Sequence, residues 1–320
     1  SNMIHPLSAE GEIIFYLNFS KSVAVLTLNA FYNKIANIRP QLTTLRHVII
    51  ATIQEELNPI LKIGFMLTKG RKIEPIPPDA DVVWYKDFIE SGKKYNGAYR
   101  TLKRGTDPAV ILYSGGTTGT TKGILLSNLC FNALSMQTFA AGDCIDPGDS
   151  MLSVMPVFHG FGLGVCIHTA FTNGCKCILV PQFNAQSYAQ LLKKQKPNVI
   201  AGVPTLFEAL LRNENMNGVD LSCLKGIFSG GDSLSIELKK KVDKFLREHG
   251  SKEQVREGYG LTECVTASCL TPRGFFKEGS IGVPYPDTYY KIVKPGTKVT
   301  AAYGEEGEIC LSGPSVMIGY

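Results

Sequence analysis

The sequence predicts an α/β protein in which mainly parallel sheets are covered by helices, with a β-rich subdomain at the carboxyl-terminal end. Three observations predict this class. Strand-like and helix-like runs alternate from Ala109 onward. Four unusual segments fall where such strands end, which is where parallel sheets bind ligands. After Thr271 the pattern changes to turns and short strands.

The alternation places each element along the chain. We expect strands at 109–113, 151–155, 175–180, 198–202, 225–229 and 253–257, with helices near 124–141, 161–172, 184–195, 204–213 and 233–248. The last helix has the expected periodicity, because Leu234, Leu238, Val242, Phe245 and Leu246 lie on one face. Such alternation implies right-handed crossovers between parallel strands.

The amino-terminal third shows the same alternation of strands and helices, but none of its segments indicates a catalytic or binding function. Strands are expected at 23–26 and 47–51, separated by a helical stretch over 29–38. Asn58 and Pro59 predict the start of another helix, with Asn58 as its cap, and 82–91 predicts a short amphipathic helix. We therefore expect a partial α/β subdomain over 1–100, a second α/β subdomain over 101–270, to which the motifs described below assign nucleotide binding, and a β-rich subdomain over 271–320.

Composition narrows the class of protein. The net charge of +5 is spread along 320 residues, and the clusters at 193–194 and 239–241 lie on predicted helices, which favours solvated faces over nucleic-acid binding. Nine cysteines occur without a CxxC pair, which predicts buried thiols in a reducing compartment. No signal peptide and no apolar run of transmembrane length are visible, so we expect a cytoplasmic protein without nucleic-acid partners.

The most informative segment is Tyr113-Ser-Gly-Gly-Thr-Thr-Gly-Thr-Thr-Lys-Gly123. Its glycines let the backbone approach a phosphate chain, its N–H groups and hydroxyls can donate to phosphate oxygens, and Lys122 can neutralise charge. It does not fit the Walker spacing, since Gly123 follows Lys122 directly. A glycine-rich surface loop without a ligand is the alternative for this segment alone.

Three further segments follow predicted strands of the same sheet: 156–164, 230–233 and 257–263. The last reads Glu257-Gly-Tyr-Gly-Leu-Thr-Glu263, which combines an aromatic ring, two glycines, a hydroxyl and a carboxylate. The carboxyl ends of parallel strands share one edge of a sheet, so we expect these segments to form one site.

Together, these motifs resemble those of the adenylate-forming enzymes, which comprise acyl-CoA synthetases, luciferases and the adenylation domains of nonribosomal peptide synthetases. Residues 113–123 align without a gap to the phosphate loop of that family, and 257–263, 229–234 and 307–320 match further motifs in the same order. Gly115 stands where the family usually has serine, and Thr121 stands where it has proline. The combination looks most like bacterial long-chain fatty-acid–CoA ligases, and Leu261 speaks against peptide synthetase domains.

The resemblance implies a role for each matching residue. ATP phosphates would be held by the loop, and the adenine would lie between the 230–232 segment and Tyr259. Thr262 would donate to the α-phosphate, and Glu263 would hold Mg²⁺, with Lys122, Thr262 and Glu263 counted as catalytic. The full implied nucleotide set is Ser114, Gly115, Gly116, Thr117, Thr118, Gly119, Lys122, Gly230, Gly231, Asp232, Gly258, Tyr259, Gly260 and Thr262.

The acid substrate is implied to bind beside the segment at 156–164. His159 matches the position at which the family has a histidine or an aromatic residue near the carboxylate, so it is also a catalytic candidate. Phe158 and Gly160 flank it, and Val203 and Pro204 are expected to form another wall of the acyl pocket. His168 is expected to be a core residue.

Structural explanations compete with several of these roles. Tyr259 alone could be a core tyrosine, and His159 alone a satisfied core histidine. Glu263 could be a carboxylate at a helix N-terminus, and Asp232 could cap the helix expected from Ser233.

The implied reaction is ATP-dependent activation of a carboxylic acid to an acyl-adenylate, followed by thioester formation with coenzyme A. The alternatives are another carboxylate or amino-acid adenylating enzyme, or a non-catalytic nucleotide-binding fragment. The family's ribose-binding aspartate, hinge and small carboxyl-terminal domain would follow Tyr320, so we expect this chain alone to bind ATP weakly and to adenylate poorly.

Overall fold

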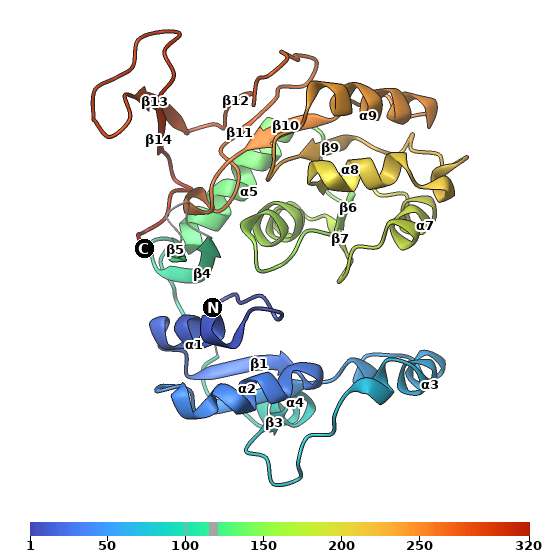
Figure 1. Ribbon diagram of the computed structural model, residues 1–320, viewed down its shortest axis with the longest axis vertical. Helices are drawn as coiled ribbons and strands as arrows, with labels where there is room; N and C mark the ends of the chain where they lie inside the picture. The colour runs from blue at the N-terminus through green and yellow to red at the C-terminus, as the bar shows by residue number, and fades with distance from the viewer. Residues whose placement is uncertain (100, 115–120) are drawn as a thin grey trace. The chain divides into compact units, whose positions relative to one another are not determined.

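The computed structural model describes residues 1–99, 101–114 and 121–320 and divides into two compact units (Figure 1). The amino-terminal unit comprises residues 2–103, and the carboxyl-terminal unit comprises 104–320 together with Ser1. Five of the expected phosphate ligands, Gly115, Gly116, Thr117, Thr118 and Gly119, lie outside the described residues. The expected boundary near residue 270 stays a prediction.

The amino-terminal unit is built on a parallel three-stranded sheet in the order β1-β2-β3. Its core consists of apolar side chains from α1, α2 and β2, with Ile38 and Ile50 almost fully enclosed. Its elements are α1 (Glu10–Phe19), β1 (Ala24–Leu28), η1 (Asn29–Phe31), α2 (Tyr32–Ile38), η2 (Arg39–Gln41), β2 (His47–Ala51), η3 (Ile53–Glu55), α3 (Pro59–Leu67), η4 (Gly70–Lys72), β3 (Val83–Trp84) and α4 (Tyr85–Lys93).

A local signal sets the start of α3. The Asn58 side chain accepts a hydrogen bond from the Leu61 N–H at 2.9 Å, and Pro59 occupies the first turn of α3, so the predicted capping is confirmed. The helix expected from residue 82 begins instead at Tyr85, because Val83 and Trp84 pair with β2 as an edge strand.

The carboxyl-terminal unit contains a seven-stranded sheet in the order β12-β11-β10-β9-β8-β6-β7. The strands from β6 to β10 are parallel, and the crossovers between them carry helices, which confirms the predicted α/β class. Its elements are β6 (Ser150–Ser153), η5 (Phe161–His168, a π-helix), α6 (Thr169–Thr172), β7 (Lys176–Leu179), α7 (Ala185–Gln195), β8 (Val199–Gly202), α8 (Pro204–Leu211), η6 (Glu214–Met216), β9 (Gly226–Ser229), α9 (Ile236–Glu248), β10 (Arg256–Tyr259), η7 (Thr262–Cys264), β11 (Cys269–Leu270) and β12 (Val283–Pro284).

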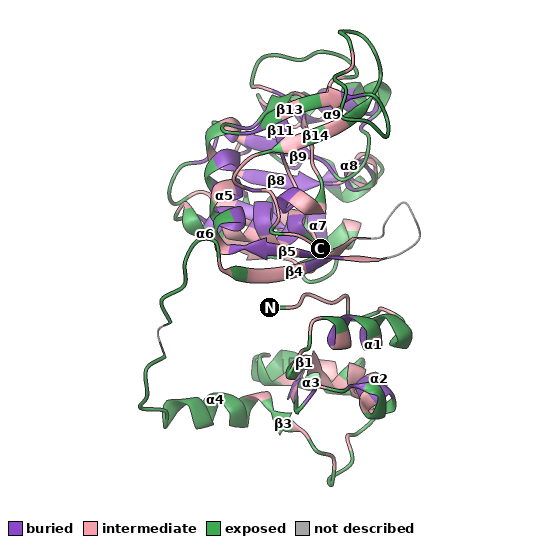
Figure 2. Cartoon of the chain, turned by 90° about the vertical axis from the view of Figure 1, so that its left-hand side faces the viewer, coloured by how far each residue is buried: buried purple, intermediate pink, exposed green. Residues whose placement is uncertain are grey.

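Alternation along the strands divides this sheet into two buried faces. Leu152, Ile200 and Ile227 face the core formed with α7, α8 and α9. Residues of opposite parity, such as Phe228, face the end of α5 (Asn128–Gly142), since Gly142 lies close to the Phe228 ring. Figure 2 shows the buried residues gathered around this sheet. Helices on both faces explain why its strands read as continuous apolar runs.

Antiparallel strands dominate the last fifty residues, as the predicted β-rich subdomain requires. β11 and β12 extend the parallel sheet in antiparallel fashion, and β13 (Tyr289–Val293) forms a separate hairpin with β14 (Glu308–Ser312).

The prediction of a helix over 124–141 is wrong at its start. β4 (Pro108–Ser114) pairs with β5 (Lys122–Ser127) in an antiparallel hairpin, and α5 begins only at Asn128, where Ser127 caps it. Residues 122–127 are buried or half-buried throughout, and all of them pair with β4. The glycine loop therefore joins two strands of a separate sheet and does not follow a strand of the parallel sheet. Strand β4 is mainly half-buried, with Leu112 enclosed.

Two other boundaries differ from the prediction. The strand expected at 253–257 is β10 at 256–259, so Tyr259 lies in the strand and not after it. The helix expected from Ser233 begins at Ile236, where the Ser235 hydroxyl accepts a hydrogen bond from the Leu238 N–H at 3.1 Å. Within the described residues, every helix is too short or too polar to cross a lipid bilayer.

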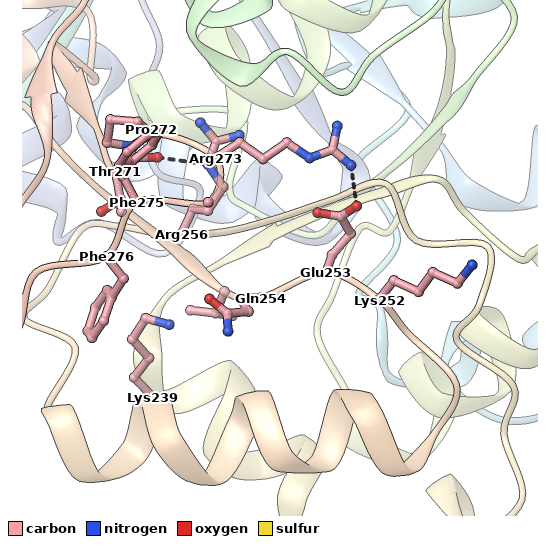
Figure 3. Close-up of a pocket in the computed structure, with 12 residues that line it drawn as sticks. Lys239, Lys252, Glu253, Gln254, Arg256, Thr271, Pro272, Arg273, Phe275 and Phe276 are labelled. Carbon is pink, nitrogen blue, oxygen red and sulfur yellow. Dashed lines mark hydrogen bonds and ion pairs between the residues drawn. The ribbon is translucent and has the colours of Figure 1, made fainter.

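A buried arginine ties β10 to the end of α5. The Arg256 guanidinium donates to the carbonyl oxygens of Gly142 at 2.5 Å and Ala141 at 2.7 Å, and it lies over the Phe228 ring. It also donates to the Thr271 carbonyl at 2.8 Å (Figure 3). The last carbonyls of a helix have no partner within the helix, so a guanidinium that donates to them satisfies buried acceptors and neutralises the negative end of the helix dipole.

We expect Arg256→Gln to destabilise the protein by about 2 to 4 kcal/mol, because it leaves buried carbonyls without donors. Urea unfolding followed by circular dichroism measures this change. Arg247→Gln is the matched control, since Arg247 is exposed in the last turn of α9. Equal stability of the two variants would contradict this role for Arg256.

All nine cysteines are free thiols, and six of them are buried: Cys130, Cys144, Cys166, Cys175, Cys264 and Cys269. Burial raises the pKa of Cys144 to about 11 and that of Cys166 to about 12, because a thiolate is poorly solvated there. Cys310 is exposed.

A raised pKa keeps a thiol protonated and unreactive until the pH approaches that value. At pH 8 we therefore expect one fast-reacting thiol, Cys310, in a titration with a chromogenic disulfide reagent, and slower reaction of the others. Cys310→Ser should remove the fast phase, whereas Cys144→Ser should leave it. A fast phase that survives Cys310→Ser would contradict this assignment.

Candidate functional site

The two described ends of the glycine loop lie side by side at the tip of the β4–β5 hairpin. Ser114 and Lys122 are cross-strand partners, and both are half-buried. The hairpin register therefore fixes where the loop begins and ends.

Lys122 and Glu263, which are far apart in the sequence, meet at the side chain of Tyr320. The ammonium nitrogen of Lys122 lies 4.9 Å from the centroid of the Tyr320 ring, and the Tyr320 hydroxyl donates to Glu263 Oε1 over 3.1 Å. Partial burial, and then the Glu263 carboxylate, raise the pKa of Tyr320, which keeps its hydroxyl protonated as a donor. A cation and a carboxylate therefore share one small region.

The carboxyl-terminal segment is held there by backbone hydrogen bonds. The Leu125 N–H donates to the Gly319 carbonyl at 2.9 Å, and the Ile318 N–H donates to the Leu125 carbonyl at 2.8 Å. On its other side, the Met317 N–H donates to the Glu263 carbonyl at 2.7 Å. Residues 317–320 thus bridge β5 and η7, which brings Tyr320 between Lys122 and Glu263.

The turn after β10 contains a strained residue. Val265 has φ 66° and ψ −56°, and the Thr266 N–H donates to the Cys264 carbonyl at 2.8 Å, so Val265 is the centre of a γ-turn. A positive φ is costly for a β-branched side chain, and Val265 is fully buried. The surrounding packing holds this turn, and the Val265 N–H donates to the Thr262 carbonyl at 3.0 Å, which ties the turn to η7.

Two glycines allow the backbone around this turn to pack closely. A Cβ atom at Gly160 would lie 1.7 Å from the Val265 carbonyl oxygen, and one at Gly260 would lie 1.9 Å from the Thr266 carbonyl oxygen. These are distances that a side chain cannot occupy. The segment at 156–164 therefore packs against residues 265–266, in the turn that directly follows the segment at 257–263.

The expected adenine segment borders the same two regions. A Cβ at Gly230 would meet the Gly258 carbonyl at 3.2 Å and the Phe161 ring at 3.8 Å, and one at Gly231 would lie 3.4 Å from Val203. Gly231 has φ +80°, which favours glycine. The ends of β8, β9 and β10 thus bring Val203, Gly230 and Gly258 together, while the adjoining Pro204 is buried at the start of α8.

Asp232 does not cap a helix, so that alternative is wrong. Ser235 caps α9, whereas Asp232 Oδ1 accepts a hydrogen bond from the Ser233 N–H at 2.7 Å and the residue is exposed. Its carboxylate lies on the outside of the turn that follows β9.

Tyr259 is half-buried, unlike a core tyrosine. Its backbone carbonyl accepts from the Ser268 N–H at 2.9 Å, which fixes the residue in the sheet. Burial raises the pKa of its phenol, with smaller contributions from the thiols of Cys264 and Cys269 and from Glu263. Its hydroxyl therefore stays neutral at physiological pH.

The structure shows how far His159 and His168 are each exposed, which the sequence alone did not determine. His159 is exposed, with the Phe158 ring 4.8 Å away, so it is not a core residue. His168, expected in the core, is half-buried: its Nε2 lies 3.0 Å from Asn132 Oδ1, and burial lowers its pKa. It lines a pocket of about 250 Å³ with Phe131 and Leu163, which explains why it is not enclosed.

A cavity of about 430 Å³ lies at the opposite edge of the sheet (Figure 3). Its lining includes the residues before β10 and those after β11, so it opens away from the carboxyl ends of the parallel strands. Three of its cations are already paired: Lys239 with Asp243, Arg256 with carbonyls and Arg273 with Glu253. This cavity is therefore separate from the candidate site.

Sequence reasoning missed two residues of the site. Tyr320 was part of a matched motif, but no role was assigned to it. Val265 carries no sequence signal, because nothing in a β-branched residue indicates a positive φ. The closely packed glycines nearby were the available indication of a crowded turn.

The chain belongs to the AMP-binding enzyme family, since a model of that family matches residues 1–320. A long-chain-fatty-acid–CoA ligase of Bacillus subtilis is 30% identical over 324 residues, which cover 99% of this chain and 56% of that protein. A probable 4-coumarate–CoA ligase of Dictyostelium discoideum is 28% identical, with 92% of this chain and 54% of that protein covered. The chain thus spans about half the length of the curated relatives it matches.

Solved structures share the fold. An anthranilate–CoA ligase in complex with anthranoyl-AMP superposes with a TM-score of 0.82 at 20% identity, covering 99% of this chain and 56% of that one. A long-chain-fatty-acid–CoA ligase from Archaeoglobus fulgidus gives 0.80 at 21% identity, covering 100% and 59%. The shared fold agrees with membership of the AMP-binding enzyme family, which the sequence motifs predicted.

We expect Gly160→Ala to destabilise the carboxyl-terminal unit by about 1 to 3 kcal/mol or more, because its Cβ would collide with the backbone of the strained turn. Thermal unfolding by calorimetry tests this. Gly105→Ala is the matched control, since its Cβ would make an ordinary contact of 3.5 Å with Leu129. A neutral Gly160→Ala would show that the contact is not tight.

Proposed function

We propose that this chain forms the nucleotide-binding part of an acid–CoA ligase that activates a fatty acid with ATP. The observation that carries the proposal is the meeting of Lys122 and Glu263 at Tyr320, beside the ends of the glycine loop. A cation that faces phosphate oxygens and a carboxylate that faces a phosphate-bound cation are the two charges that such a site requires. Family membership supports the same assignment.

The nucleotide would lie along the carboxyl ends of β8, β9 and β10. Ser114 and Lys122 would hold the β- and γ-phosphates together with the expected ligands Gly115, Gly116, Thr117, Thr118 and Gly119. Tyr259 and the 230–232 segment would enclose the adenine, and Thr262 would donate to the α-phosphate. The contacts of Gly230 with Gly258 favour this arrangement, because they leave no side chain where a flat base would lie.

Glu263 fits a magnesium ion that is shared with the phosphates. Its carboxylate is half-buried and is oriented by the Tyr320 hydroxyl, and Mg²⁺ commonly binds through one carboxylate plus phosphate oxygens. No group of three His, Cys, Asp or Glu side chains that could hold a metal ion occurs among the described residues. When bound, the ion would neutralise phosphate charge.

The proposed chemistry proceeds in two steps in the whole protein. A carboxylate oxygen of the acid attacks the α-phosphorus of ATP, and the bond to the β-phosphate oxygen breaks, which gives acyl-AMP and pyrophosphate. The thiol of coenzyme A then attacks the acyl carbonyl, loses its proton and displaces AMP. Positioning and charge neutralisation account for the first step, since two anions must meet.

The acid would enter beside His159. This residue is exposed next to Phe158, and the buried Gly160 holds their segment against the turn that carries Thr262. Val203 and Pro204 would form the other wall. A fatty acid is favoured by the long-chain ligase similarity, whereas the coumarate and anthranilate relatives make an aromatic acid the second candidate.

We expect Lys122→Met and Glu263→Gln each to weaken Mg²⁺–ATP binding by about tenfold or more, because each removes a charge-assisted contact. Isothermal titration of the 320-residue chain measures this. Lys240→Met and Glu278→Gln are matched controls from an exposed ion pair in the same unit. If Lys122→Met and Glu263→Gln both bind Mg²⁺–ATP as tightly as the unchanged chain, the proposed nucleotide site is wrong.

Substrate choice is tested separately on the full-length protein. Pyrophosphate release is compared across fatty acids of graded chain length, 4-coumarate, anthranilate and amino acids. We expect the highest kcat/KM for a fatty acid. If kcat/KM is highest for an aromatic acid, the proposed substrate class is wrong but the proposed nucleotide site is not affected. If kcat/KM is highest for amino acids, the activity is that of a peptide synthetase.

A further inference from the structure

We propose that helix α3 of the amino-terminal unit docks onto an anionic lipid surface. The inference concerns a different unit from the nucleotide site and does not depend on the proposed function. It rests on three observations: the exposure of apolar side chains on α3, the cations around the helix, and the absence of ion pairs for those cations among the described residues.

Helix α3 exposes nearly all of its apolar surface. Of its nine residues, Phe65 is half-buried and every other one is exposed. The large apolar side chains are exposed by 83% at Ile60, 57% at Leu61, 62% at Ile63, 54% at Met66 and 65% at Leu67. Exposed apolar surface of this extent on one short element marks an interaction site.

The exposed side chains form a continuous stripe. Ile60, Ile63 and Leu67 follow the i, i+3, i+7 spacing and so lie on one face of the helix. Met66 lies beside that face, and Leu61 lies further round, toward Phe65. Phe65 packs on the opposite side, against Gly70. In Figure 1, α3 stands at one end of its unit, away from α1.

Positive charge surrounds this stripe. Lys62, Lys69, Arg71 and Lys72 lie between Leu57 and Ile73, and no carboxylate occurs in that interval. All four are exposed, and among the described residues none of them forms an ion pair. An apolar stripe flanked by unpaired cations is complementary to a bilayer with anionic headgroups, where apolar side chains enter the acyl boundary and cations stay at the headgroups.

The geometry fits a helix that lies on the membrane and does not cross it. Nine residues reach only about half of what a helix needs to span the hydrocarbon core. Two short 3₁₀ helices, η3 and η4, flank α3 in the chain and separate it from β2 and β3.

A second exposed apolar segment, at Phe275 and Phe276, can be compared with α3 as a lipid-docking surface. Phe275 and Phe276 are exposed by 76% and 41% beside the cavity of Figure 3. Two cations near them are paired, Arg273 with Glu253 and Lys240 with Glu278, whereas Lys252 and Lys277 form no ion pair among the described residues. That segment therefore carries fewer unpaired cations than the four around α3.

The test is co-sedimentation of the 320-residue chain with vesicles made of equal parts phosphatidylcholine and phosphatidylglycerol. We expect the double variant Ile63→Asp with Leu67→Asp to bind about tenfold more weakly, and Arg71→Gln with Lys72→Gln to bind more weakly at low salt. The matched control is Val299→Asp with Tyr303→Asp, which makes the same charge change at exposed positions of the carboxyl-terminal unit. Its binding should stay close to that of the unchanged chain.

Hydrogen exchange locates the contact independently of any variant. Anionic vesicles should slow amide exchange over residues 59–73, whereas vesicles of phosphatidylcholine alone should have little effect. Equal binding to both vesicle types, or protection confined to other segments, would overturn the proposal. So would a concentration-dependent dimer that the Ile63→Asp and Leu67→Asp changes abolish, without vesicle binding, because α3 would then dock onto a second copy of the chain.

Discussion

The constraint on which the candidate site depends is the close backbone packing around the turn that follows β10. The Val265 carbonyl occupies the space that a side chain on Gly160 would need, and the Thr266 carbonyl does the same at Gly260. Because this packing leaves no free volume, the buried Val265 is held in a γ-turn that it would not adopt alone. The Val265 N–H donates to the Thr262 carbonyl, which ties that turn to η7.

The second determinant is the way in which distant segments share the edge of one sheet. β8, β9 and β10 end side by side, so Val203, Gly230 and Gly258 meet without any local sequence signal between them. Residues 317–320 then close the site from the other side by pairing with β5 and with the backbone of Glu263. The charges of Lys122 and Glu263 thus come together through backbone pairing, not through a direct ion pair.

The two units differ in how completely they bury their apolar residues. The parallel sheet of the carboxyl-terminal unit is covered on both faces, and Arg256 holds the end of α5 to β10 through three carbonyls. The amino-terminal unit has a smaller core and leaves α3 uncovered. The candidate nucleotide site and the exposed helix α3 therefore belong to different units of the chain.

The sequence by itself determined the α/β class, the strands and helices of the parallel sheet from β6 to β10, the Asn58 cap and the family, because periodicity, caps and contiguous motifs are local properties. It misplaced the start of α5, since residues 122–127 become a strand only by pairing with β4. It also left open whether Asp232 caps a helix and whether His159 is buried. Only the tertiary structure decided these points, along with the roles of Tyr320 and Val265, because each depends on contacts between segments far apart in the chain.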